Sequence, residues 1–311
     1  MVELFEQNIR TNERQSSKGN QLKWENDGTW YKADYTGYEG FAEYVISYLL
    51  KKSSLQDYEY VVYDTEQIKY KNIIYNGAKS RTFLFDDWQI VTLERLFKTF
   101  QNQSLYSMIW NINDVEERLA FLVENVERVT GLRNFGIYMN KLLTIDAFFL
   151  NEDRHTHNIA VLMNGKGKFD YCPIFDHGAG LLSDTTVDYP LGEDVFSMMG
   201  EVRAKTISSD FDEQLDASEK LYGCNLKFDF TKQDVRAILD DGCGYNTDVI
   251  THNYLIDIDK CSPIPMDDGE KTFSAMSLFQ IDKIVYDLNE NINDKLKNYT
   301  LDDLLKLVST I

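Results

Sequence analysis

Residues 146–180 read D-A-F-F-L-N-E-D-R-H-T-H-N-I-A-V-L-M-N-G-K-G-K-F-D-Y-C-P-I-F-D-H-G-A-G, and this stretch decides the fold. Apolar residues recur at helical spacing over residues 132–150, which predicts an amphipathic helix that leads into it. Asp146 falls in the middle of the apolar stripe of this helix. Because a buried carboxylate is costly unless it is paired or hydrogen-bonded, we expect Asp146 to hold the following loop. Arg154, His155 and the backbone amides of the loop are its candidate partners.

A hairpin is predicted after the loop. Residues 159–163 and 169–175 read as strands, and Asn164-Gly165-Lys166-Gly167 reads as the turn between them. A hairpin returns the chain to the end from which it started. We therefore expect Asn158, which precedes the first strand, and Asp176, which follows the second, to lie close together.

These residue types at these positions suit phosphoryl transfer. Asp153 and Asn158 have the spacing that phosphoryl-transfer loops use between the base and a metal-binding Asn. Asn158 and Asp176 offer the oxygen ligands that Mg²⁺ prefers. Gly178 and Gly180 would let the backbone pass close to a ligand. The sequence thus predicts a catalytic loop and a metal-binding turn.

The strings N-E-D-R-H-T-H-N and P-I-F-D-H-G resemble the catalytic and metal motifs of HipA-like serine/threonine kinases. They are also similar to the D-R-H-x-x-N and D-F-G elements of the phosphatidylinositol 3/4-kinases. The resemblance implies a two-lobed, protein-kinase-like α+β fold that uses ATP and Mg²⁺. By this resemblance Asp153 is the catalytic base, Asn158 and Asp176 bind Mg²⁺, and His155 supports the loop.

Two departures from the family pattern are visible. The chain has no counterpart of the extra N-terminal domain of full-length HipA toxins, so the resemblance is to a compact, stand-alone kinase. His177 replaces the aromatic residue of D-F-G, so the usual packing switch cannot be assumed.

The first 88 residues are predicted to form a β-rich N-lobe and residues 89–311 a mostly helical C-lobe. Asn26-Asp27-Gly28 predicts a hairpin turn, and residues 39–51 have helical spacing. Tyr60-Val61-Val62-Tyr63 and Thr82-Phe83-Leu84-Phe85 read as strands separated by a turn at Asn76-Gly77.

The N-lobe would supply the ATP-binding half of the site. Lys32 would contact the α- and β-phosphates and pair with Glu43, which we favour over Glu39. The phosphate-covering turn would comprise Ser16, Ser17, Lys18, Gly19 and Asn20, continuing to Gln21. Backbone groups of Phe83, Leu84 and Phe85 would contact adenine as the hinge. HipA-like enzymes are silenced by phosphorylation of their own phosphate loop, so Ser16 or Ser17 is a candidate autophosphorylation site.

The C-terminal third is less regular. Residues 184–220 read as polar and loop-rich, and residues 232–239 as helical. Leu278, Ile281, Val285, Leu288 and Ile292 have the spacing of a packed helix, and Thr300 with Asp303 resembles a capping box.

A net charge of −19 disfavours nucleic acid and anionic membrane surfaces as partners, because both are bound through clustered Lys and Arg. No secretory signal and no CxxC pair are present, which predicts free thiols in the cytoplasm. A basic protein or peptide substrate fits the charge. Residues 181–200 contain no Lys or Arg, which disfavours phosphoinositides, although Arg203 and Lys205 follow directly. An antitoxin-type partner cannot be read from one chain, and a small DNA-binding protein encoded beside it would indicate one.

Two other readings remain open at this point. His155 and His157, with Asp153, Asp176 and His177, offer ligands for the Zn²⁺ or Mn²⁺ of a metallohydrolase. Against this reading, an i,i+2 histidine pair points both rings the same way only on a strand. The third reading is a non-catalytic pseudokinase or interaction module.

Overall fold

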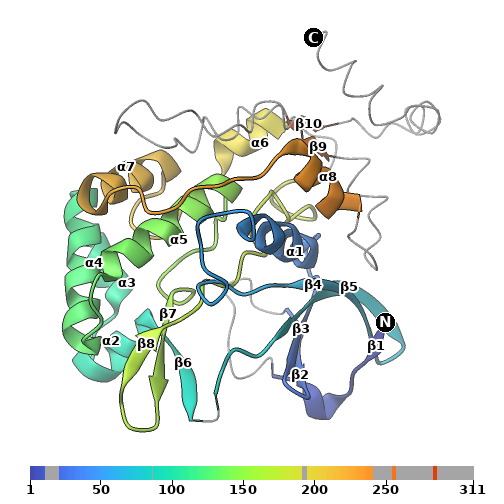
Figure 1. Ribbon diagram of the computed structural model, residues 1–311, viewed down its shortest axis with the longest axis horizontal. Coiled ribbons are helices and arrows are strands. Elements are labelled where there is room, and N and C mark those ends of the chain that lie inside the picture. The colour runs from blue at the N-terminus through green and yellow to red at the C-terminus, as the bar shows by residue number, and fades with distance from the viewer. Residues whose placement is uncertain (11–20, 86, 191–194, 241–253, 257–282, 286–311) are drawn as a thin grey trace.

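The computed structural model describes residues 1–10, 21–85, 87–190, 195–240, 254–256 and 283–285. A five-stranded sheet with the order β1-β4-β5-β3-β2 forms the first region (Figure 1). Its strands are β1 (Val2–Glu3), β2 (Lys23–Asn26), β3 (Thr29–Ala33), β4 (Asp64–Tyr70) and β5 (Ile73–Arg81). Helix α1 (Glu39–Leu50) connects β3 to β4 and packs against β4 and β5.

The second region is mostly helical. Its helices are α2 (Leu93–Gln101), α3 (Leu105–Trp110), α4 (Val115–Thr130), α5 (Phe135–Phe149), α6 (Val195–Glu201), α7 (Phe211–Tyr222) and α8 (Lys232–Asp240). A three-stranded sheet accompanies them, in the order β6 (Trp88–Thr92), β7 (Ala160–Asn164) and β8 (Phe169–Tyr171). Strands β9 (Tyr254–Ile256) and β10 (Lys283–Val285) pair separately. The α+β, two-lobed architecture expected from the sequence is therefore present.

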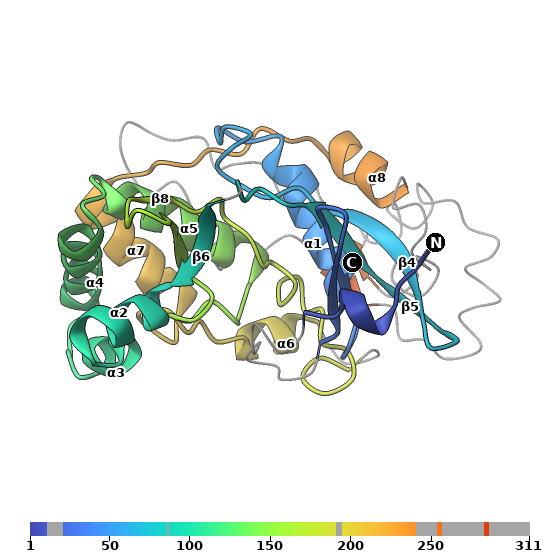
Figure 2. The ribbon, with the colours of Figure 1, turned by 90° about the horizontal axis from the view of Figure 1, so that it is seen from below.

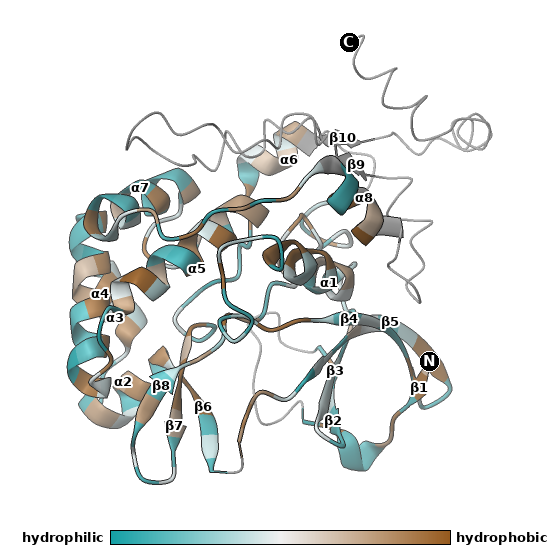
Figure 3. Cartoon of the chain, viewed as in Figure 1, coloured by the Kyte–Doolittle hydropathy of each residue, from teal (hydrophilic) through white to brown (hydrophobic). Residues whose placement is uncertain are grey.

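Helix α1 lies between the first sheet and the helical region in both views of the ribbon (Figures 1 and 2). One continuous cluster of buried apolar side chains joins α1 to α5 and α7. Hydrophobic residues accordingly dominate α1 and the inner part of α5 (Figure 3). The shared core fixes α1 relative to the loop that follows α5. The chain crosses between the sheets from Arg81 to Trp88, and the division at residues 88 and 89 stays a prediction.

Two predicted features of the first region are present. Asp27 and Gly28 have φ of 50° and 70° in the turn that joins β2 to β3, as the Asn-Asp-Gly signal indicates. Helix α1 occupies residues predicted to be helical. It is buried almost throughout because it packs against the sheet on one side and the second region on the other.

The turn predicted at Asn76-Gly77 is wrong. The β4–β5 turn lies at Lys71 and Asn72, with φ of 48° and 63°. Gly77 lies inside β5, where a Cβ would sit 2.0 Å from the carbonyl oxygen of Lys32. A Cβ on Gly40 of α1 would lie 2.5 Å from the backbone of Gly77. The glycine therefore allows α1 and β3 to approach β5 closely, and this close packing overrides the local turn signal.

Both expected strands beside that turn are also wrong. Residues 60–63 form only an isolated bridge, from Tyr60 to Ile174, before β4 begins at Asp64. Residues 82–85 have no strand partner, because β5 ends at Arg81. Backbone pairing in both segments is brief: the Val61 amide donates to the Ile174 carbonyl, and the Thr82 amide donates to the Gly28 carbonyl, each at 2.9 Å.

Residues 184–220, predicted to be loop-rich, contain α6 and most of α7. Helix α7 begins where the Asp210 side chain accepts from the amide of Glu213. Most residues of α7 are polar, but Phe211, Leu215 and Ser218 are buried on one face of the helix. Residues 232–239 are helical, as predicted. The helix predicted around Val285 is wrong at Lys283–Val285, which form β10; its other predicted residues and the Thr300–Asp303 box lie outside the described residues.

Helix α5 begins at Phe135, after Asn134 in the left-handed conformation with φ of 65°. It is buried along most of its length, its polar Asn140, Thr144 and Asp146 included, and packs against α4 and α7. Within the part of the chain that the structure describes, no helix is long and apolar enough to cross a membrane.

Candidate active site

The end of α5 positions the predicted catalytic loop. Leu150, with φ of 50°, terminates the helix, and the Asn151 amide donates to the carbonyl of Asp146 at 2.9 Å. After the loop, β7 and β8 pair antiparallel with Val161 opposite Tyr171. This is the predicted hairpin with a shorter second strand, and it carries the chain back to the loop.

Asp146 and Arg154 form the buried support of the loop. Arg154 Nε lies 2.9 Å from Asp146 Oδ2, and the two side chains are 2% and 0% exposed. Asn151 Nδ2 donates to Asp146 Oδ1 at 2.8 Å. Burial raises the pKa of Asp146, and the charge and hydrogen bonds of Arg154 oppose that rise. Of the three partners expected for Asp146, the structure therefore selects Arg154, with Asn151 beside it.

Arg154 also joins the loop to the predicted metal turn. Its Nη1 donates to the carbonyls of Asn158 at 3.0 Å and Phe175 at 2.8 Å. Its Nη2 donates to the carbonyl of Asp176 at 3.1 Å. A single buried guanidinium thus holds the backbone of both segments that carry the proposed Mg²⁺ ligands.

Lys32 lies between two carboxylates. Its Nζ is 2.6 Å from Glu43 Oε1 and 2.6 Å from Asp176 Oδ1. Burial alone would lower the pKa of Lys32, but Asp176 and Glu43 together raise it well above the usual value. Burial would likewise raise the pKa of Asp176, yet Lys32 holds it far below its usual range. Burial raises the pKa of Glu43, and the charge of Lys32 opposes that rise. The three groups form the junction of the two regions.

Glu43, not Glu39, is the partner of Lys32. Glu39 accepts from the amides of Tyr35 at 3.2 Å, Thr36 at 2.7 Å and Gly37 at 3.2 Å. It stabilises the turn before α1 and its first residues. The second oxygen of Glu43 accepts from the amide of His177 at 2.8 Å. Glu43 thereby connects Lys32 to the backbone just after Asp176.

Asp153 and Asn158 contact each other within the loop. Asn158 Nδ2 donates to the Asp153 carbonyl at 2.7 Å and to Asp153 Oδ2 at 3.0 Å. Near the other carboxylate oxygen, Oδ1, lie His155 Nε2 at 3.7 Å and Lys205 Nζ at 3.9 Å. Burial lowers the pKa of His155. The residues that line the pocket at this place are Gln21, Lys23, Tyr35, Glu39, Glu43, Asp153, Asp176, Gly178, Ala179 and Ser183.

The three clustered histidines separate into two environments. His177 is fully buried, and neither ring nitrogen has a hydrogen-bond partner among the described residues. Burial lowers its pKa well below the usual value and so favours the neutral ring. The His155 and His157 rings lie edge to face, 5.2 Å apart. No group of three or more His, Cys, Asp or Glu side chains in the described part could hold a metal ion, so the metallohydrolase ligand set is not assembled.

The residues present fit Mg²⁺ and a nucleotide in part. Because Asn158 uses its nitrogen toward Asp153, its oxygen is the atom suited to a cation, and Asp176 supplies a charged oxygen.

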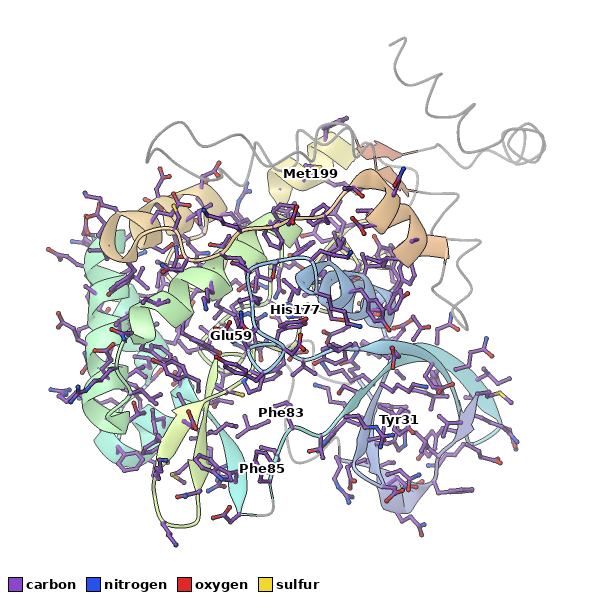
Figure 4. The ribbon with its side chains drawn as sticks, viewed as in Figure 1. Tyr31, Glu59, Phe83, Phe85, His177 and Met199 are labelled. Carbon is purple, nitrogen blue, oxygen red and sulfur yellow. The ribbon has the colours of Figure 1, made fainter. Side chains whose placement is uncertain are left out.

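Phe83 packs on Phe175 with ring centroids 6.3 Å apart, whereas Phe85 is exposed. Both lie on the segment between the two sheets (Figure 4). The Leu84 amide donates to Thr82 Oγ1 at 3.3 Å. Residues 16–20 of the predicted phosphate turn lie outside the described residues.

Two neighbours of Lys32 were missed from the sequence. Lys23 lies directly opposite Lys32 in the β2–β3 pairing, lines the same pocket and lowers the pKa of Asp176. The Tyr63 hydroxyl accepts from the Asp176 amide at 3.4 Å, and Lys32 Nζ lies 5.3 Å from the centroid of its ring. The predicted turn at Asp27-Gly28 already implies the Lys23–Lys32 pairing, so this signal was available.

No protein-family model matches the sequence, and no curated protein matches it significantly. Among solved structures, the crystal structure of a Helicobacter pylori proinflammatory kinase, CtkA, is similar, with 15% sequence identity. The match covers 78% of this chain and 87% of that chain, with a TM-score of 0.46. At this TM-score the structural similarity is partial. The candidate site is defined by the contacts within this chain.

Proposed function

We propose that this chain is an Mg-ATP-dependent phosphotransferase that moves the γ-phosphoryl group to a serine or threonine hydroxyl of a protein. The observation that carries the proposal is Lys32, held at 2.6 Å by both Glu43 and Asp176. Phosphoryl transfer needs a cation on the phosphates, side chains for Mg²⁺ and a group that orients the acceptor. A lysine paired with a helix glutamate, beside a catalytic aspartate and asparagine, supplies these together.

Each residue has a defined task in this proposal. Lys32 binds the α- and β-phosphates, and Glu43 keeps its ammonium directed into the pocket. Asn158 and Asp176 would hold Mg²⁺, which when bound neutralises charge on the phosphates. Asp153 accepts a hydrogen bond from the acceptor hydroxyl and takes its proton as the new bond forms. Arg154 holds the catalytic loop and the turn at Asp176 in a fixed relative position.

The acceptor is proposed to be a basic protein segment. The pocket beside Asp153 is also lined by Glu39, Glu43 and Asp176, and the whole chain carries a net charge of −19. Such a field favours the approach of positively charged peptides. Ser16 and Ser17 are the proposed autophosphorylation sites. An intact mass that stays unchanged after incubation with Mg-ATP would contradict that part of the proposal.

Labelled Mg-ATP incubated with purified protein and basic protein acceptors tests the function. Wild type is expected to transfer label to Ser or Thr. Asp153→Asn and Asp176→Asn are expected to reduce transfer by about 10²–10⁴-fold. Asp170→Asn, an exposed acid on β8, is the matched control and should behave as wild type.

Equal, slow label release by wild type and Asp153→Asn would sink the catalytic proposal and leave a non-catalytic nucleotide-binding or interaction module. One tightly bound zinc per purified chain would instead support the metallohydrolase reading.

A further inference from the structure

Lys205 approaches Asp153 from outside the catalytic loop. Its ammonium lies 3.9 Å from Asp153 Oδ1, and 44% of its side chain is exposed. An ion pair this long and this exposed contributes little to folding stability, because water screens it. The stability of the fold therefore does not explain why a cation lies beside the proposed base.

The backbone around Lys205 is held firmly to the loop. The next residue, Thr206, is fully buried, and its hydroxyl donates to the Arg154 carbonyl at 2.6 Å. The amides of residues 206–208 all donate to Gln214 Oε1 at 2.9–3.3 Å. Gln214, on α7, is itself buried. Two sets of buried hydrogen bonds thus keep Lys205 at a fixed place beside Asp153, while its ammonium stays accessible.

The charge of the pocket supplies a reason for this cation. Asp153, Asp176, Glu43 and Glu39 line one pocket. Lys32 is already engaged by two of these carboxylates, both at 2.6 Å. A γ-phosphoryl group that enters here adds negative charge, which spreads over its three peripheral oxygens during transfer. Lys23 and Lys32 come from the sheet, whereas Lys205 comes from the helical region on the side of Asp153.

We propose that Lys205 binds the γ-phosphoryl group during transfer, an inference that rests on the proposed function. The bond between the γ-phosphorus and the β–γ bridging oxygen breaks, and a bond to the acceptor oxygen forms. The acceptor proton passes to the Asp153 carboxylate, and ADP leaves. Lys205 stays protonated throughout and donates a hydrogen bond to a peripheral oxygen. Lys205 Nζ lies 3.9 Å from Asp153 Oδ1. A phosphoryl group bound by Lys205 would therefore lie next to an acceptor hydroxyl bound by Asp153.

Lys205→Met, Lys205→Arg and the control Lys166→Met test this role. Lys166 is exposed in the turn between β7 and β8, away from Asp153. Lys205→Met is expected to lower kcat by about 10- to 100-fold, the range for one charge-assisted hydrogen bond. It should weaken the binding of Mg-ATP but not of Mg-ADP, which lacks the γ-phosphate. Lys205→Arg should restore kcat to within a few-fold of wild type, and Lys166→Met should match wild type.

A merely structural lysine would give a different pattern. Unchanged kcat in Lys205→Met, or equal weakening of ATP and ADP binding, would overturn the inference. Thermal unfolding of all variants checks folding, and Lys205→Gln provides a second uncharged side chain if the Met variant is unstable. If wild type transfers phosphate and Asp153→Asn does not, but Lys205→Met and Lys205→Gln do, only Lys205 loses its role. If wild type neither binds Mg-ATP nor transfers phosphate, the proposed function fails and this inference with it.

Discussion

Asp146 pairs with Arg154, which lies eight residues later in the same segment, whereas Lys32 pairs with Asp176, which lies 144 residues later in the sequence. The first pair holds a loop to the helix that precedes it. The second joins a strand of the first sheet to a turn of the second region. The loop half of the site is therefore a local unit supported by a buried ion pair. The sheet half exists only while the two regions are packed together.

The largest effect on stability is expected in the local half. Asp146→Ala leaves the Arg154 guanidinium, 2% exposed, without its carboxylate. Removing one partner of a buried pair costs about 3–5 kcal/mol, because the remaining charge is buried and uncompensated. Urea unfolding followed by circular dichroism measures this loss. Glu116→Ala, which breaks an exposed pair with Lys220, is the control and should cost about 0–1 kcal/mol. Similar losses in both variants would show that Asp146 does not carry the loop.

The junction of the two regions should respond in activity. Lys32→Met removes the cation shared by Glu43 and Asp176, and we expect phosphate transfer to fall by about 10²–10³-fold. Lys79→Met, which removes a lysine paired with Glu66 on the same sheet, should keep wild-type activity. Transfer rates with labelled Mg-ATP measure both. Retained activity in Lys32→Met would show that Lys32 does not bind the phosphates.

The two glutamates of α1 should differ in kind. Glu43→Gln removes the charge of the buried partner of Lys32 and should lower transfer by about 10-fold per folded molecule. Glu39→Gln weakens the charged acceptor of three amides that precede α1 and should cost about 1 kcal/mol of folding free energy. Its activity per folded molecule should stay near wild type. Parallel kinetics and urea unfolding check this, and a reversal of the two patterns would exchange their roles.

His177 should make the stability of the protein depend on pH. Burial keeps its folded-state pKa well below the unfolded value of about 6.5. As the pH falls below that value the unfolded chain binds a proton that the folded chain does not, so stability falls. The loss approaches about 1.4 kcal/mol per pH unit. His177→Phe should remove this slope between pH 7 and 5 in unfolding measured without added metal. Equal slopes in both proteins would place the titration elsewhere.

Sequence patterns predicted elements that depend on neighbours close in the chain. Helix α5, the loop, the β7–β8 hairpin and the Asp27-Gly28 turn all follow local spacing and turn chemistry. Sequence patterns gave wrong predictions where packing between segments far apart in the chain determines the local structure. Asn76-Gly77 reads as a turn, but its glycine serves the close approach of α1 and β3 to β5. Helix α7 was missed because its buried face is sparse within a polar segment.

The identities of Asp153, Asn158 and Asp176, and their order around a helix, a loop and a hairpin, are set by the chain alone. Hydrogen bonds from Asn158 to Asp153 join these two residues within one short loop, so their five-residue spacing indicates the contact without coordinates. Packing around the junction of the two regions decided which glutamate faces Lys32. Tertiary packing within the second region brought Lys205 to Asp153 and Arg154 to both loops. These contacts join segments far apart in the sequence or choose among equivalent local partners. Local spacing cannot make either choice, because burial and the orientation of each side chain are properties of the folded whole.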